Sequence, residues 1–374
     1  MWLFWYFKEP RKLNVLILDK TVLTNSVQEH ISLSWILNNE QYIHTSFGAY
    51  DRKRDYYGFF PDNRGNYRIN DLDNYTSQQL DSLSKIYDVA FYTDMYGIYS
   101  NEWIDKYFPE KINDERFKAN RSGKIYGGMS SNDLVFLKLM KARKKLIINE
   151  FNMIASPTQG YIRREYEKEF HVKWTGWVGR YYDNLDTLIN LDIPRWLIKN
   201  YMRDNQNTWP FKNSGIAFVR DDDKVVILEN KTHLDIDIPY IYTNMDDCIA
   251  FNIPSAMKYP FWFDIISTDS TMHEISKYEI GSNIRGDSLL SKWNIPREFP
   301  ALVKPRKNNL YYYMAGDFSD NPIDMKSSYF RYVELLSFIT LTHEKIERNT
   351  FFWNYYRPLI KNIFTEYQKS VEQN

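Results

Sequence analysis

Three apolar runs constrain the fold of this chain more than any other feature. They cover residues 13–19 (LNVLILD), 87–94 (YDVAFYTD) and 145–152 (KLIINEFN), and none alternates between apolar and polar residues. Such runs are typical of strands that are buried on both faces of a parallel sheet. Helical patterns at residues 26–37 and 130–144 separate them. This alternation predicts an α/β fold with a mainly parallel sheet and helices on both faces.

Polar residues follow each of these runs directly. Because ligands of parallel α/β sheets bind beyond the carboxyl ends of the strands, we expect these side chains to gather along one sheet edge. The predicted edge residues are Asp19, Lys20, Thr21, Asp94, Tyr96, Glu150 and Asn152. A carboxylate is costly to bury alone, whereas at a solvated crevice it can bind or catalyse. The alternative is that Glu150 and Asn152 cap neighbouring helices and loops.

The segment HVKWTGWVGRYY, residues 171–182, contains two tryptophans and an arginine among glycines. We interpret it as a rigid surface turn that presents Trp174, Trp177 and Arg180 to a ligand. Aromatic and guanidinium groups can stack on sugars or bases. The alternative is a packing plug beneath the crevice.

Composition excludes several classes of function. The chain has 48 basic and 48 acidic residues, which argues against binding nucleic acid through bulk charge. Cys248 is its one cysteine, and its six histidines form no HExxH motif. It also contains no Walker A or GxGxxG sequence. We therefore expect no metal and no cofactor; an acidic turn at residues 315–322 is explained by Asx-turn chemistry.

The first twelve residues, MWLFWYFKEPRK, include an unbroken apolar run from Trp2 to Phe7. A membrane-spanning helix needs roughly 20 apolar residues, so this run cannot cross a bilayer. Tryptophan and tyrosine concentrate where membrane helices leave the hydrocarbon, so the run is either the remnant of a membrane anchor or a segment packed on the protein. A membrane-anchor remnant predicts a cell-envelope location, whereas a segment packed on the protein allows a cytoplasmic one.

The sequence predicts three parts. Residues 1–12 form the N-terminal segment, residues 13–212 an α/β domain, and residues 213–374 a β-rich extension with C-terminal helices at residues 327–340 and 351–370. The extension begins with a hairpin signal, two apolar runs around an aspartate-rich turn.

Taken in order, several segments resemble the class I glutamine amidotransferase-like superfamily. The resemblance is to a poorly characterised bacterial branch, in which one N-terminal membrane helix often precedes the domain. The segments are LNVLILDKTV, EHISLSWIL, DYYGFFP, DVAFYTDMYGIY, IYGGMSSND, INEFNMIASPT, WTGWVGRYY, FWFDI and AGDFSDNP. They cover most of the chain. The resemblance implies a flavodoxin-like α/β domain and an N-terminal membrane anchor that is truncated here.

The catalytic chemistry of that superfamily is not carried by this sequence. Glutamine amidotransferases use a cysteine on a sharp strand-to-helix turn, whereas Cys248 lies in NMDDCIAFN, which has no such turn. We therefore expect a non-catalytic binding or accessory protein of the cell envelope, with a polar ligand such as a carbohydrate, or a protein partner. The alternative is a glycan hydrolase in which two carboxylates among Asp19, Asp94 and Glu150 lie about 5 to 10 Å apart.

Overall fold

The apolar runs form the centre of a ten-stranded sheet. The computed structural model describes residues 1–111, 123–335 and 345–373. The runs become β2 (Val15–Asp19), β7 (Val89–Tyr92) and β10 (Leu146–Asn149), and every residue of these strands is buried. Because both faces of these strands are covered, the absence of alternation in the sequence has a direct structural cause.

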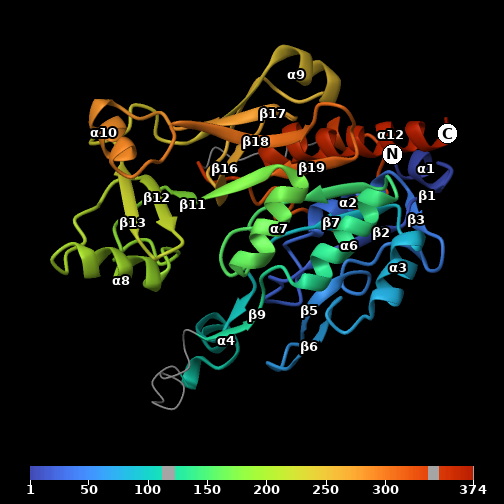
Figure 1. Ribbon diagram of the computed structural model, residues 1–374, viewed down its shortest axis with the longest axis horizontal. Helices are drawn as coiled ribbons and strands as arrows, with labels where there is room; N and C mark the ends of the chain where they lie inside the picture. The colour runs from blue at the N-terminus through green and yellow to red at the C-terminus, as the bar shows by residue number, and fades with distance from the viewer. Residues whose placement is uncertain (112–122, 336–344, 374) are drawn as a thin grey trace.

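The sheet is mixed (Figure 1). Its other strands are β5 (Tyr57–Pro61), β6 (Tyr67–Asn70), β14 (Tyr240–Thr243), β15 (Ala256–Lys258), β17 (Met272–Glu279), β18 (Glu298–Pro305) and β19 (Tyr311–Met314). The order is β15-β14-β17-β18-β19-β10-β7-β2-β5-β6. The pairs β5–β2, β2–β7, β7–β10 and β10–β19 are parallel, and the other neighbours are antiparallel. A parallel core is therefore present, but "mainly parallel" describes only the centre of this sheet.

A second, antiparallel sheet contains β11 (Val172–Tyr182), β12 (Gly215–Arg220), β13 (Val225–Glu229) and β16 (Phe263–Thr268), in the order β13-β12-β11-β16. The prediction of a surface turn at Trp174–Arg180 is wrong, because this segment is part of β11. Its register shifts between Trp174 and Val178, where Gly176 has a φ of +93°. The glycines therefore mark an irregularity within a strand rather than a turn between strands.

Both sheets contain strands from either side of residue 212. β11 pairs with β12 and with β16, while β19 pairs with β10 in the parallel core. Strands of the β-rich half are consequently hydrogen-bonded to strands of the first half in both sheets. The described residues also form two small sheets: β1 (Arg11–Lys12), β3 (Tyr42–His44) and β4 (Gly48–Ala49) in one, and β8 (Ile98–Tyr99) with β9 (Lys124–Tyr126) in the other.

Helices pack on the parallel core in two groups. In the first group α3 (Ser77–Ile86) contacts α6 (Ser131–Ala142), which contacts α7 (Gly160–Phe170); in the second α2 (Ile31–Asn39) contacts α12 (Arg357–Glu372) (Figure 1). The other helical segments in the described part of the chain are α4 (Ser100–Tyr107), η1 (Pro109–Lys111), α8 (Arg195–Asp204), α9 (Met245–Phe251), α10 (Ile284–Lys292), η2 (Met325–Tyr329), α11 (Asn349–Phe351) and η4 (Phe352–Tyr356). Of the predicted helix at 327–340, residues 336–340 lie outside the described part of the chain.

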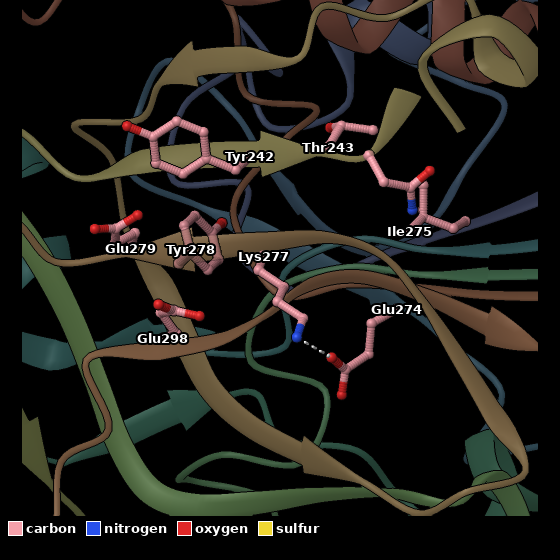
Figure 2. A pocket seen from close by; sticks show the side chains of 9 residues that line it. Tyr242, Thr243, Glu274, Ile275, Lys277, Tyr278, Glu279 and Glu298 are labelled. Carbon is pink, nitrogen blue, oxygen red and sulfur yellow. Dashed lines mark ion pairs between the residues drawn. The ribbon is translucent and has the colours of Figure 1, made fainter. Parts of the chain in front are cut away.

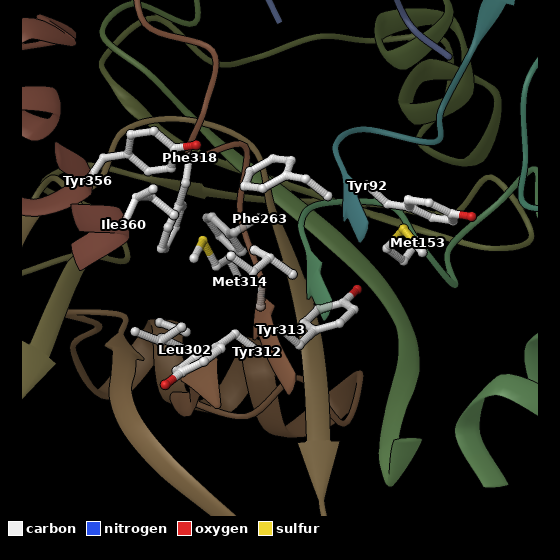
Figure 3. Packing of buried hydrophobic residues seen from close by; sticks show 14 of the residues in the cluster. Tyr92, Met153, Phe263, Leu302, Tyr312, Tyr313, Met314, Phe318, Tyr356 and Ile360 are labelled. Atoms are coloured by element: carbon white, nitrogen blue, oxygen red, sulfur yellow. The ribbon is translucent and has the colours of Figure 1, made fainter. Parts of the chain in front are cut away.

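The core is aromatic and joins the C-terminal helices to the sheet. Phe318 and Tyr356 lie on one side of Met314 and Phe263, and Tyr313 lies beyond them (Figure 3). Phe318 and Tyr355 make edge contact with ring centroids 5.8 Å apart. Much of the aromatic content of the sequence therefore packs in the interior.

The N-terminal run forms α1 (Trp2–Tyr6), a helix of five residues. The Trp5 indole donates to the carbonyl oxygen of Asn38 at 3.0 Å and packs edge-on against Tyr329. The other large side chains of the run point outward, with Phe4 62% exposed. Among the described residues, no helix combines the length and apolar character needed to cross a membrane.

Candidate functional site

A pocket of about 880 Å³ lies at the carboxyl ends of β7 and β10. The second sheet and α8 form its opposite wall. Six aromatic side chains line it: Tyr96, Tyr99, Phe151, Trp174, Trp196 and Trp262. Polar and charged groups lie between the rings, as is usual for a site that recognises a small polar ligand.

The floor of the pocket comes from residues directly after two parallel strands. Asp94 and Tyr96 follow β7, and Asn152 follows β10. The Asp94 Oδ1 accepts a hydrogen bond from the backbone N–H of Tyr96 at 2.7 Å, and the Asn152 side chain is a second partner of its carboxyl group. The structure thus brings together three of the predicted edge residues, as the strand-end argument expects.

Asp94 is half-exposed, because one side of the residue opens into the pocket. The protein that surrounds the rest of the carboxyl group raises its pKa well above the ordinary value, and the negative charge of Asp317 raises it further. Desolvation and like charge both favour the neutral acid. Asp94 therefore contributes less negative charge to the pocket than an exposed aspartate does.

Glu102 is a second acid in the pocket that sequence reasoning missed. It lies in the first turn of α4, where its Oε2 accepts from the backbone N–H of Tyr99 at 3.4 Å. Burial raises the pKa of Glu102 to about 7. The capping position at the helix start was its one signal in the sequence, and that signal is structural rather than functional.

The wall formed by β11 contributes Trp174 and Arg180. The Trp174 indole donates to the carbonyl oxygen of Trp177 at 2.7 Å, which fixes its ring. The Arg180 guanidinium lies 4.8 Å from the ring centre of Tyr182 and 5.8 Å from that of Trp262. In the described residues Arg180 forms no ion pair with a carboxylate. Trp177 lies outside the pocket and is buried, with Arg220 over its ring.

Two other predicted edge residues are fully buried: Asp19 in a contact with His30, and Lys20 in an ion pair with Asp133. The Asp19 Oδ2 lies 2.6 Å from His30 Nδ1, and the Lys20 Nζ donates to Asp133 at 2.6 Å. His30 Nε2 lies 2.9 Å from the carbonyl oxygen of Arg52, which can only accept, so this nitrogen carries a proton. Both pairs lie in the protein interior and fix the loops after β2.

Thr21 and Glu150 also form hydrogen bonds within the protein at this edge of the sheet. Thr21 Oγ1 donates to the Asp94 carbonyl oxygen at 3.0 Å. The Glu150 Oε2 accepts from both the backbone N–H and the hydroxyl of Ser319, at 3.1 and 2.6 Å. Glu150 is 1% exposed and does not line the pocket. The structure therefore supports the alternative in which Glu150 fixes a loop.

An acidic cluster lies behind the pocket floor. It contains Glu29, Glu150, Asp317 and Asp320. Arg348 pairs with Asp317 at 3.4 Å and with Asp320 at 3.1 Å. Burial raises the pKa of Asp317 to about 7, helped by the charge of Asp320. Across the described residues, no group of three or more His, Cys, Asp or Glu side chains has an arrangement that holds a metal ion.

A smaller hollow of about 320 Å³ lies over β14, β17 and β18 (Figure 2). Lys277 pairs with Glu274 at 3.1 Å, while Glu279 and Glu298 lie on the other side of Lys277. The residues that line this hollow include none of the predicted site residues.

Comparison with known proteins gives little support for a specific family. No protein-family model matches the chain. No curated protein matches it. One solved structure from Bacteroides uniformis ATCC 8492, described as ThuA-like, is 10% identical and has a TM-score of 0.38. The match covers 88% of this chain and 93% of that one. At this identity and TM-score, the likeness does not establish a shared fold or a shared function.

Proposed function

We propose that this chain is a binding or accessory protein whose pocket at the ends of β7 and β10 takes a polar ligand such as a carbohydrate. One observation carries the proposal: the pocket combines six aromatic rings with the Asn152 amide and a guanidinium that has no carboxylate partner in the described chain. Aromatic faces stack on the apolar faces of sugars, and a few polar groups set orientation.

The strand order supports the superfamily part of this proposal. The five parallel strands run β5-β2-β7-β10-β19, which is 2-1-3-4-5 in chain order. That is the flavodoxin-like order, in which ligands bind beyond the carboxyl ends of the strands. We therefore propose a flavodoxin-like core of the glutamine amidotransferase-like kind that has lost the thiol chemistry. Cys248 lies in α9, far along the chain from this edge.

The cell-envelope location is also a proposal. It is supported by the exposed aromatic side chains of α1, because such residues favour the membrane interface. Cell fractionation of the natural gene product tests it, and a product found entirely in the soluble fraction would exclude it.

A second candidate is a glycan hydrolase that uses Asp94 and Glu102. The observation in its favour is that both carboxyl groups line the same pocket and both have a raised pKa, as general acids do. Asp19 and Glu150 cannot serve in this role as they stand, because their carboxylates are buried in internal pairs.

A calorimetric screen of oligosaccharides tests the binding proposal. Trp262→Ala removes an aromatic face from the pocket, and Tyr242→Ala, in the smaller hollow, removes a ring elsewhere as the control. We expect a saccharide whose binding Trp262→Ala weakens and Tyr242→Ala leaves unchanged. A well-folded protein that binds no saccharide would overturn the proposal. Release of sugar over hours, lost in Glu102→Gln, would instead favour the hydrolase.

A further inference from the structure

The cations around the pocket differ in whether they are neutralised. Arg203 pairs with Asp204 at 3.1 Å, and Arg220 pairs with Asp222 at 2.7 Å. Just outside the pocket, Arg163 pairs with Asp221 at 3.0 Å. Arg180, by contrast, is half-buried and forms no ion pair within the described residues. A half-buried guanidinium without a carboxylate is an available binding group for an anion.

The position of Arg180 is set by its neighbours. It lies within β11, where it is paired in register with Ala217 of β12. Its guanidinium lies near the Tyr182 and Trp262 rings. Guanidinium groups that pack against rings lose little additional freedom when they form a two-point hydrogen bond. The Trp262 ring lines the same pocket, so a sugar ring stacked there would bring its substituents close to Arg180.

The acids of the pocket oppose this charge only weakly. Asp94 and Glu102 both have a raised pKa, so each carries less negative charge than an exposed acid does. Asp221 is already paired with Arg163, and Asp223, which also lines the pocket, interacts with Arg203. Lys199 of α8 lines the pocket and adds a second positive charge. Next to Arg180 the pocket therefore favours a negative charge on its ligand.

We infer that the ligand is an acidic carbohydrate, a saccharide that contains a uronic acid, and that Arg180 binds its carboxylate. The inference rests on the proposed function and names the ligand class of the same pocket. A single guanidinium without an ion-pair partner matches one negative charge through two parallel hydrogen bonds, the geometry of a carboxylate. A sugar phosphate shares the anionic chemistry and serves as a separate arm of the test.

The test is calorimetric titration with three ligands of matched ring structure: a glucuronic-acid oligosaccharide, the neutral glucose oligosaccharide of equal length, and glucose 6-phosphate. We expect the uronate to bind roughly tenfold or more tightly than the neutral sugar. Arg180→Gln removes this preference, while Arg180→Lys keeps only part of it, because an ammonium group lacks the planar fork. Arg164→Gln, an exposed change of equal charge on α7, keeps it in full.

Each outcome bears on one claim. Equal binding of acidic and neutral sugars overturns the inference but leaves the binding proposal standing. Binding of neither sugar by a folded protein overturns both. Preference for the phosphate overturns the carboxylate assignment. If Arg180→Gln does not fold, the salt dependence of wild-type binding decides: uronate affinity that does not fall as salt rises overturns the inference.

Discussion

The backbone N–H of Asn152 donates to the Asp264 Oδ2 at 3.0 Å, although 112 residues separate the two in the chain. The Tyr313 hydroxyl donates to the same oxygen at 2.7 Å. Asn152 has a φ of +62°, so its left-handed backbone is held by a carboxylate from β16. One buried acid of the second sheet thus fixes the floor of the pocket in the first.

Asp264→Asn should flatten the dependence of stability on pH. Burial raises the pKa of Asp264 to about 7, so the native state binds its proton more tightly than the unfolded state does. The stabilisation is full below about pH 4 and is lost as pH rises through about 7. Asparagine cannot titrate and can still accept both hydrogen bonds. Over this window the wild type should lose up to about 4 kcal/mol more than the variant.

Urea unfolding of both proteins at pH 4.5, 6 and 8 checks this expectation. Parallel stability curves would show that Asp264 is charged throughout and would contradict it.

Glu150→Gln should be far milder than Glu150→Ala. Burial raises the pKa of Glu150 well above its ordinary value, so glutamine resembles the neutral acid that the site favours. Its amide oxygen can accept both donors of Ser319. Alanine leaves the buried Ser319 N–H without an acceptor, at about 1–3 kcal/mol, while the Ser319 hydroxyl can still donate to the Glu29 carbonyl oxygen at 2.7 Å. Thermal melting of the three proteins measures the difference, and equal melting of the two variants would argue against the Ser319 contact as the cause.

Lys20→Met should destabilise the protein by about 3–5 kcal/mol, because it leaves Asp133 buried without its cation. Adding Asp133→Asn should recover part of this loss. In the wild type the Ser130 N–H donates to Asp133 Oδ2 at 2.8 Å. Asparagine keeps an oxygen that can accept this hydrogen bond, and it removes the unpaired charge. A double-mutant cycle by denaturant unfolding tests the coupling. Additive effects would mean that the two side chains do not act as a pair.

Gly58→Ala should prevent folding or cost more than about 3 kcal/mol. Gly58 has a φ of +132°, and a Cβ there would lie 1.7 Å from the carbonyl oxygen of Asp19. Gly48→Ala is the matched control, with a φ of +81° and no atom within 4 Å of its Cβ. The control should cost only about 1–2 kcal/mol of backbone strain. Similar losses in the two variants, measured by circular dichroism melts, would exclude the clash as the cause.

Local sequence was a good guide to the parallel core and to part of the pocket. Unbroken apolar runs identified β2, β7 and β10, and the residues after β7 and β10 supplied Asp94, Tyr96 and Asn152 to the pocket. Ser130 caps α6 with a reciprocal bond from Asp133, a pattern that local spacing also encodes. Such features depend on neighbours a few residues apart.

Local sequence pointed to only part of the other wall of the pocket: Trp174 and Arg180 were among the predicted ligand contacts, whereas Trp262 and Trp196 gave no local signal. Trp262 and Trp196 come from segments that long-range antiparallel pairing and helix packing bring to the strand ends. The glycines near Trp174 suggested a turn, yet pairing with β12 and β16 extends the segment as a strand. Period and propensity cannot distinguish these outcomes, since partner strands decide them.

The sequence by itself determined that this chain builds a sheet with a doubly buried centre and that polar groups follow its strands. Only the tertiary structure decided which of those groups line a pocket. Asp94 opens into a pocket, whereas Glu150, at the equivalent end of the next strand, is closed off by Ser319 from a turn 169 residues away. Burial is a property of what packs against a side chain, and for Glu150 those neighbours lie at the far end of the chain.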